Sequence, residues 1–198
     1  MKRSLLLFLW LCASLPLAAY PTHPSELSKP VQTLYRLEET KQLLTMAEKD
    51  GDIHIRTASF GFEASNAAWM ASERTIYLNF SKPRSPGSLI ASIVFELHNA
   101  LSSREFAYYD HLAMNRQISR QKYIEAVERL EYANARKTAY ILYKGVRKGI
   151  FPADAFWCIA PTFEEHYQVQ IEAGHSSLIG YIYDDIIRTS SPSSLASK

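Results

Sequence analysis

Hydrophobic and polar residues alternate along the chain in two rhythms, which predict a mainly helical protein with a short sheet near its N-terminal end. Apolar residues recur at three- and four-residue steps over 31–49, the spacing of an amphipathic helix. Alternation over 53–58 and the apolar segment 76–80 predict two strands, with a loop or a further short strand around 60–62 and 69–70. Further helices are predicted over 86–102, 104–115, 119 to 143 or 148, 161 or 162 to 172, and 177–188. This order indicates an α+β fold, mostly helical, with a small N-terminal antiparallel or mixed sheet.

The N-terminal segment 1–19 has the pattern of a secretory signal peptide. Lys2 and Arg3 precede an apolar run over 5–17, and the small residues Ala18 and Ala19 follow it. The run is shorter than the roughly 20 apolar residues that a membrane-spanning helix needs. We therefore expect cleavage after Ala19, a secreted or periplasmic location, and no stable membrane insertion after cleavage. An uncleaved N-terminal anchor is the alternative.

The rest of the chain is predicted to form a single domain. Segment 20–30 is rich in proline and is expected to be an irregular lead-in, and the domain itself is expected to span 31–188. The last segment, 189–198, is rich in serine and is expected to be a disordered tail.

The charge of the chain argues against a nucleic-acid-binding protein, and its cysteine content argues against a protein stabilised by internal disulfides. The formal charge is +2, from 22 Lys+Arg against 20 Asp+Glu, and removal of Lys2 and Arg3 with the signal would leave no net charge. No basic field then remains for nucleic acid, so none is expected as a partner. Cys158 would be the one cysteine of the mature chain, which excludes an internal disulfide. Because apolar residues flank Cys158, we expect it to be buried.

A line of polar residues crosses an otherwise apolar helix at 89–101. Ser92, Glu96, Asn99 and Ser103 are spaced four, three and four residues apart, which places them on one face. A carboxylate cannot lie in an apolar interior without a partner, because its desolvation would cost several kcal/mol or more. Glu96 therefore faces a cleft, a cation or hydrogen-bond donors.

A second carboxylate with an amide lies on the long helix downstream. Glu131 and Asn134 are three residues apart among the inward-facing apolar positions of that helix. We expect this pair to face Glu96 and Asn99. Two carboxylates brought close together would perturb each other's pKa.

The order of these segments resembles the zincin-like metallopeptidases of the glutamate type. The matching features are the strand 75–79, the turn 81–88, the helix 89–100, and Glu131 in the sequence EYANA at 131–135. In that family the helix carries the motif HExxH, and a later helix supplies a glutamate ligand. The resemblance covers roughly residues 73 to 140. It implies a zincin-like core, Glu96 in the place of the general base and Glu131 in the place of the third metal ligand.

The two zinc-ligand histidines of that motif are missing. The motif positions hold Phe95, Glu96, Leu97, His98 and Asn99, and neither Phe nor Asn is a ligand that Zn²⁺ favours. His98 lies on another helix face from Glu96. His111, His166 and His175 lack a ligand spacing on any single helix, so we expect no metal, zinc included, and no other cofactor.

Three functional interpretations stay open at this point. The first is an exported, non-catalytic binding protein or pseudoenzyme on a degenerate metallopeptidase-like scaffold, with a peptide or protein as its partner. The second is a peptidase-like hydrolase that uses Glu96 as general base, with Glu131 and Asn99 positioning water or substrate, or with an unusual metal held by carboxylates. The third is a helical protein of the export compartment, whose polar line only specifies packing.

Overall fold

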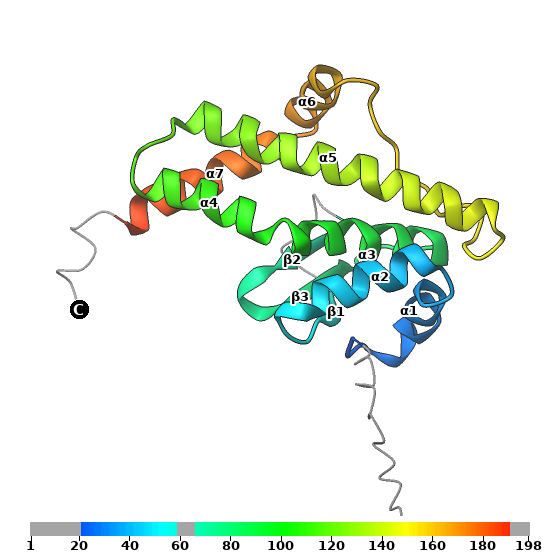
Figure 1. Ribbon diagram of the computed structural model, residues 1–198. Coiled ribbons are helices and arrows are strands. Elements are labelled where there is room, and N and C mark those ends of the chain that lie inside the picture. Colours follow the sequence, from blue (N-terminus) through cyan, green and yellow to red (C-terminus); the bar gives the residue numbers. More distant parts are fainter. Residues whose placement is uncertain (1–20, 59–65, 191–198) are drawn as a thin grey trace, which may run out of the picture.

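The computed structural model describes residues 21–58 and 66–190, and it shows a small sheet packed against helices and a longer, wholly helical part (Figure 1). The strands are β1 (His54–Ala58), β2 (Ala67–Met70) and β3 (Thr75–Asn79). The helices are α1 (Ser28–Leu34), α2 (Glu38–Ala47), α3 (Pro86–Leu101), α4 (Ser103–Met114), α5 (Arg120–Arg147), α6 (Phe163–Glu172) and α7 (His175–Thr189). Short 3₁₀ helices occur at Ser25–Leu27, Glu48–Asp50 and Ala71–Glu73. The predicted α+β class with a mixed sheet is confirmed.

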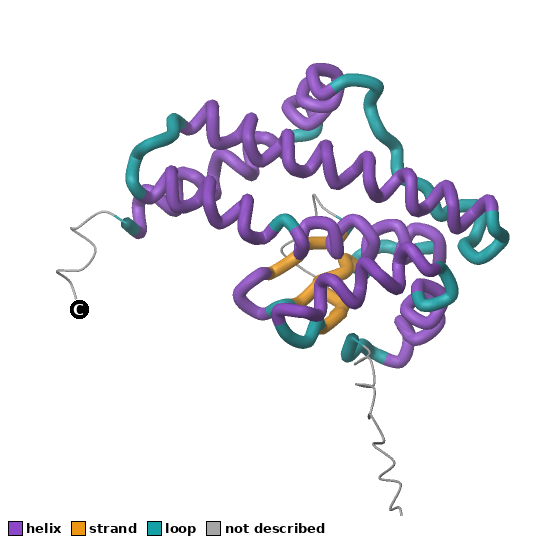
Figure 2. The backbone as a smooth tube through the Cα atoms, in the orientation of Figure 1, coloured by secondary structure: helices purple, strands orange, loops and turns teal. Residues whose placement is uncertain are grey.

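The three strands, orange in Figure 2, form one sheet with the order β1-β3-β2, so β3 is its central strand. β1 runs parallel to β3, with Ile55 opposite Ile76, and β2 runs antiparallel to β3, with Trp69 opposite the same Ile76. The segment around 69–70 is therefore a strand. Ile55, Ile76 and Leu78 are fully buried and form the sheet's contribution to the core.

Helix α3 is the centre of the larger core. Ser85 caps its N-terminus by accepting a hydrogen bond from the backbone N–H of Ser88, and Pro86 occupies the first turn, as the sequence predicts. The helix packs against α1, α2, the sheet and α5. Ile90, Ile93, Val94 and Leu97 are almost completely buried in this core.

The N-terminal helical prediction is wrong in two respects. Segment 31–49 is not one helix, because Leu37 is extended and separates α1 from α2. The hydroxyl of Thr40 donates to the carbonyls of Leu34 and Leu37, which satisfies backbone groups that the break leaves open. The lead-in 20–30 is also not irregular, since helical structure begins at Ser25 and buries Leu27 completely.

The remaining helices form a second, smaller core at the other end of α5. Ala113 of α4, Tyr123 and Val127 of α5 and Ile179 of α7 are its buried members, together with Ile124. Thr162 caps α6 and Ser119 caps α5 through side-chain acceptors, close to the predicted starts. The predicted helices from 86 onward are confirmed, with small shifts at their ends.

Cys158 is exposed, so the expectation of a buried thiol is wrong. The connection between α5 and α6 has no regular period, and Ala155 and Phe151 are the residues that it buries instead. The predicted signal peptide, most of the predicted tail and the segment around 60–62 lie outside the described residues. In the part of the chain that the structure describes, no helix is long and apolar enough to cross a membrane.

The close approach of α5 to the following loop gives a stability prediction. A Cβ added at Gly145 would lie 2.1 Å from the buried ring of Phe151, whereas the nearest atoms to one added at Gly180 belong to the guanidinium of Arg120, the end of a flexible and partly exposed side chain that pairs with Asp184. We expect Gly145→Ala to lower the free energy of unfolding by about 1–3 kcal/mol, because overpacking outweighs the gain in helix propensity. Gly180→Ala should be neutral or slightly stabilising. Thermal denaturation followed by circular dichroism measures both, and equal shifts in the two variants would contradict this account.

Candidate functional site

Glu96 lies in the interface between α3 and α5 with only 4% of its surface exposed. Its Oε2 accepts a hydrogen bond of 3.0 Å from Nδ2 of Asn99, one turn further along α3. The predicted carboxylate line therefore faces the protein interior, and its first partner is a neutral amide of the same helix.

Asn99 is in turn held by α5. Nδ2 of Asn134 donates to Oδ1 of Asn99 at 3.0 Å and also to Oγ of Ser102 at 3.0 Å. Lys137 Nζ donates to Oδ1 of Asn134 at 3.3 Å. This chain of side chains, from Glu96 through Asn99 to Asn134, joins the two helices, as the sequence predicts for the two amides.

Burial raises the pKa of Glu96 to about 8. The hydrogen bond from Asn99 opposes this shift, and the charge of Glu131 adds to it. Glu96 is thus mainly protonated and neutral near pH 7, which lowers the cost of its position inside the protein.

Glu131 lies near enough to Glu96 to raise its pKa, but its ionic partner is on α7. Oε2 of Glu131 is 3.5 Å from Nε2 of His175, and the Glu131 side chain is 21% exposed. Burial raises the pKa of Glu131 to about 7, while the charge of His175 acts in the opposite direction. The expected neighbourhood of Glu96 and Glu131 is present, with His175 added to it.

Glu128, one turn before Glu131, is the most deeply buried carboxylate of the cluster, with no exposed side-chain surface. Its Oε1 accepts a hydrogen bond of 2.6 Å from Oγ of Ser176 and lies 3.1 Å from Nδ1 of His175. Its Oε2 lies 3.5 Å from Nε2 of His166 on α6. Burial alone would raise the pKa of Glu128, but the neighbouring imidazoles of His166 and His175 and the hydroxyl of Ser176 lower it to about 2.

His175 is the cationic member of this group. Burial would lower its pKa, but its hydrogen bond to Glu128 and the charges of Glu131 and Glu128 raise it to about 9. The two carboxylates beside this imidazolium stabilise its charge, which would otherwise be costly to bury.

The two C-terminal histidines lie together at one carboxylate, which their spacing in the sequence does not predict. Their nine-residue separation has no ligand spacing on one helix, but His166 lies on α6 and His175 begins α7, and both side chains reach Glu128. A break at Gly174, with a positive φ of 81°, separates the two helices. Glu128 was also missed, although its three-residue spacing from Glu131 places both carboxylates on one face of α5.

The two ends of the predicted polar line have separate structural partners, and Ser103 is the first residue of α4 and not part of α3. Ser92 Oγ accepts a hydrogen bond of 2.6 Å from Arg84, and Ser103 Oγ accepts one of 2.9 Å from the indole of Trp69. His98 is buried on another side of the helix, where burial lowers its pKa to about 4. These three residues lie outside the cluster around Glu96.

The zinc that the metallopeptidase resemblance implies does not fit the HExxH positions. The ring of Phe95 stacks on Trp157 with centroids 4.4 Å apart, and both ends of the Asn99 amide are already hydrogen-bonded within the protein. Donor atoms do converge elsewhere. Glu128, Glu131 and His175 each offer a ligand atom, and these atoms lie within 4.8 Å of one another.

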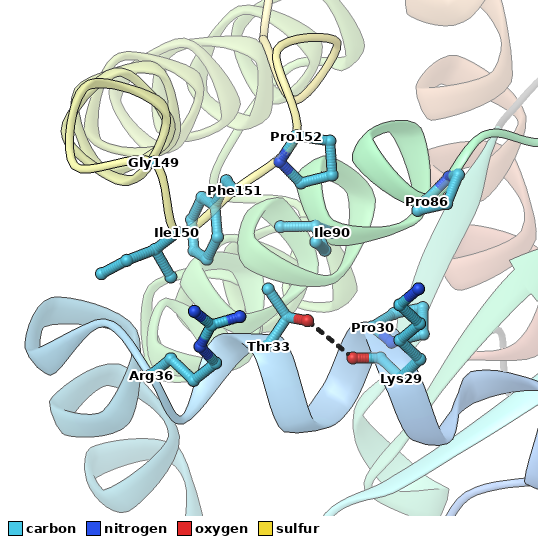
Figure 3. A pocket seen from close by; sticks show the side chains of 10 residues that line it. All are labelled: Lys29, Pro30, Thr33, Arg36, Pro86, Ile90, Gly149, Ile150, Phe151 and Pro152. Atoms are coloured by element: carbon cyan, nitrogen blue, oxygen red, sulfur yellow. Dashed lines mark hydrogen bonds between the residues drawn. The ribbon is translucent and has the colours of Figure 1, made fainter.

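A hollow of about 230 Å³ lies apart from this cluster, between α1, the start of α3 and the loop that follows α5 (Figure 3). Lys29 and Arg36 border it, and Ile90 and Phe151 form part of its apolar wall. Its lining contains none of the buried carboxylates or histidines. We therefore place the candidate site at Glu96 and Glu131, where these groups lie together.

No protein family, curated protein or solved structure matches this chain. The functional argument therefore depends on the geometry of the cluster.

Glu96→Gln tests the protonation of the buried carboxyl. Because the pKa of Glu96 is about 8 in the folded chain and 4.5 without the fold, the folded state holds this proton more tightly. Its contribution to stability is complete below pH 4.5 and is lost as the pH rises through 8. We expect the wild type to lose stability relative to Glu96→Gln across this window, by up to about 1.4 kcal/mol per pH unit. Urea unfolding at several pH values measures the difference, and parallel curves would contradict the assignment.

Asn99→Ala tests the connection between the helices. The substitution removes the donor to Glu96 and the acceptor of Asn134, leaving buried polar groups without partners, so we expect a loss of about 2–4 kcal/mol in unfolding free energy. Asn115→Ala is the matched control, because Asn115 is exposed and bonds within its own helix end to His111. Chemical denaturation of both variants gives the comparison. A similar small loss in each would show that the buried amide chain is energetically unimportant.

Proposed function

We propose that the protein is an exported, non-catalytic binding protein on a metallopeptidase-like scaffold, and that its ligand is an extended peptide or protein segment. The observation that carries the proposal is that hydrogen bonds hold the buried Glu96 carboxyl in the interface between α3 and α5. Asn99 occupies the place of the second zinc histidine and uses its amide to hold the Glu96 carboxyl against α5. A general base in a working site needs access to a water molecule, whereas this carboxyl is buried and neutral near pH 7.

The sheet supports the choice of an extended ligand. β2 is an outer strand, and among the described residues no other strand pairs with its outer edge. Such an edge has unpaired backbone groups that can bind a peptide as an additional strand. β2 packs against α3, and the backbone of Trp69 in β2 lies near enough to Glu96 to act on its pKa, so the binding edge would lie beside Glu96.

A hydrolase is the second candidate. Glu96 and Glu131 have pKa values of about 8 and 7, close to the range in which carboxyl groups act as general acids and bases. In this case the ionised form of Glu96, which predominates above pH 8, would accept a proton from water, and Glu131 would orient the substrate or the water.

One experiment separates these functions. Mature protein, with and without added Zn²⁺, is incubated with a library of unstructured peptides, and cleavage is followed by mass spectrometry while binding is followed by hydrogen–deuterium exchange of the protein. We expect no cleavage and increased protection of residues 67–70 in β2, with α6 as the internal control that does not change. Cleavage by the wild type that Glu96→Gln abolishes would establish the hydrolase instead. Absence of both cleavage and protection would contradict both candidates and leave the polar cluster with a purely structural role.

A further inference from the structure

Glu128, Glu131 and His175 have an arrangement that suits a metal ion. The two carboxylates lie one helical turn apart on α5, and His175, at the start of α7, reaches both of them. Nδ1 of His175 is 3.1 Å from Glu128, and its Nε2 is 3.5 Å from Glu131. Each of the three residues offers one ligand atom, and these three atoms lie within 4.8 Å of one another.

His166 provides an independent indication that this group is incomplete. The residue is 9% exposed, and its Nε2 has no hydrogen-bond partner in the described part of the chain. The atom points at Oε2 of Glu128, which is 3.5 Å away and also lacks a hydrogen-bond partner among those residues. An unsatisfied buried polar atom costs about 1–3 kcal/mol, so two of them facing each other indicate a missing partner between them.

We propose that Glu128, Glu131, His166 and His175 form a binding site for a divalent first-row transition metal, with Zn²⁺ as the representative ion. Imidazole nitrogen and carboxylate oxygen are both ligands of such ions. Glu128, Glu131 and His175 are the three residues whose donor atoms converge, and His166, which faces the other carboxylate oxygen of Glu128, would complete the set from α6. This site is not that of the HExxH motif: it lies on α5, α6 and α7, and Glu131 is the residue that connects it to the surroundings of Glu96.

The exposure of the four side chains agrees with entry from one side. Glu128 has no exposed side-chain surface and His166 has 11%, so these two form the floor of the site. His175 and Glu131 are 28% and 21% exposed and form its rim. The rim residues have room to turn toward an ion, and Ser176 Oγ already orients the Glu128 carboxylate from the side, as outer-shell hydrogen bonds do in metal sites.

Such an ion would strengthen the part of the molecule with the smaller core. The apolar cluster shared by α4, α5 and α7 contains five buried residues, and α6 joins it through partly buried aromatic contacts. Metal binding to the folded chain raises its stability by mass action, and here it would tie α5, α6 and α7 together.

The test uses the mature chain after removal of metals with a chelator. Zn²⁺ is added, and binding is measured by calorimetry and by the shift of the melting temperature. We expect one equivalent to bind and to raise the melting temperature. Glu131→Gln and His175→Gln should each weaken the affinity at least tenfold, and His111→Gln, a change of an exposed histidine on α4, should leave it unchanged.

Circular dichroism shows whether each variant is folded, and Glu131→Gln preserves side-chain size at a partly exposed position. Co²⁺ gives a second readout, because its visible spectrum depends on the ligands and should change in both site variants. Absence of stoichiometric binding, or binding that survives both substitutions, would overturn the proposal. The peptide-binding function is measured separately at β2, so either proposal can fail without the other.

Discussion

The interior of this protein is organised by the need to accommodate acidic side chains between packed helices. α3 and α5 meet over a strip that is polar on both sides, and neither helix can bury its apolar residues without also burying Glu96, Asn99 and Asn134. The amides link the helices by hydrogen bonds that depend on register: a shift by one residue would turn Asn134 away from Asn99. This strip therefore specifies how the sheet-containing part and the helical part fit together, at some cost in stability.

The same strip joins two regions of different electrostatic character. Around Glu96 the partners are neutral amides, and the raised pKa of the carboxyl keeps it protonated and neutral near pH 7. Around Glu128 the partners are imidazoles and a hydroxyl, and the carboxylate is held as an anion. Glu131 lies between these regions and is influenced by both, since the charges of Glu128 and His175 act on it in opposite directions. A ligand or ion that reached Glu131 would consequently change the electrostatic surroundings of Glu96 as well.

Local sequence signals were sufficient for most of the fold and for half of the cluster. Three- and four-residue periodicity, with Ser85, Ser119 and Thr162 as caps, located the helices from 86 onward, because these signals act within a turn or two of the chain. The same reasoning placed Glu96 and Asn99 on one face.

The convergence of His166 and His175 on Glu128 was beyond such reasoning, because it depends on how α6 and α7 return to α5 across 30 to 50 residues. The break at Leu37 escaped for a related reason: a buried leucine fits a helical period equally well, and only the Thr40 hydroxyl makes the extended conformation favourable there. Cys158 was misjudged because apolar neighbours indicate burial only where a regular period decides which side chains point inward.

The length of α5 has a mechanical consequence. Its 28 residues extend over about 42 Å, and it contributes Tyr123, Ile124 and Val127 to one apolar core and Ile141 and Leu142 to the other. The polar strip occupies the stretch between these contributions, so α5 and the junction of α3 with α4 join two apolar cores that are separate from each other. Because the C-terminal helices share the smaller core, we expect them to open at a lower free energy than the sheet end, with the boundary near the middle of α5.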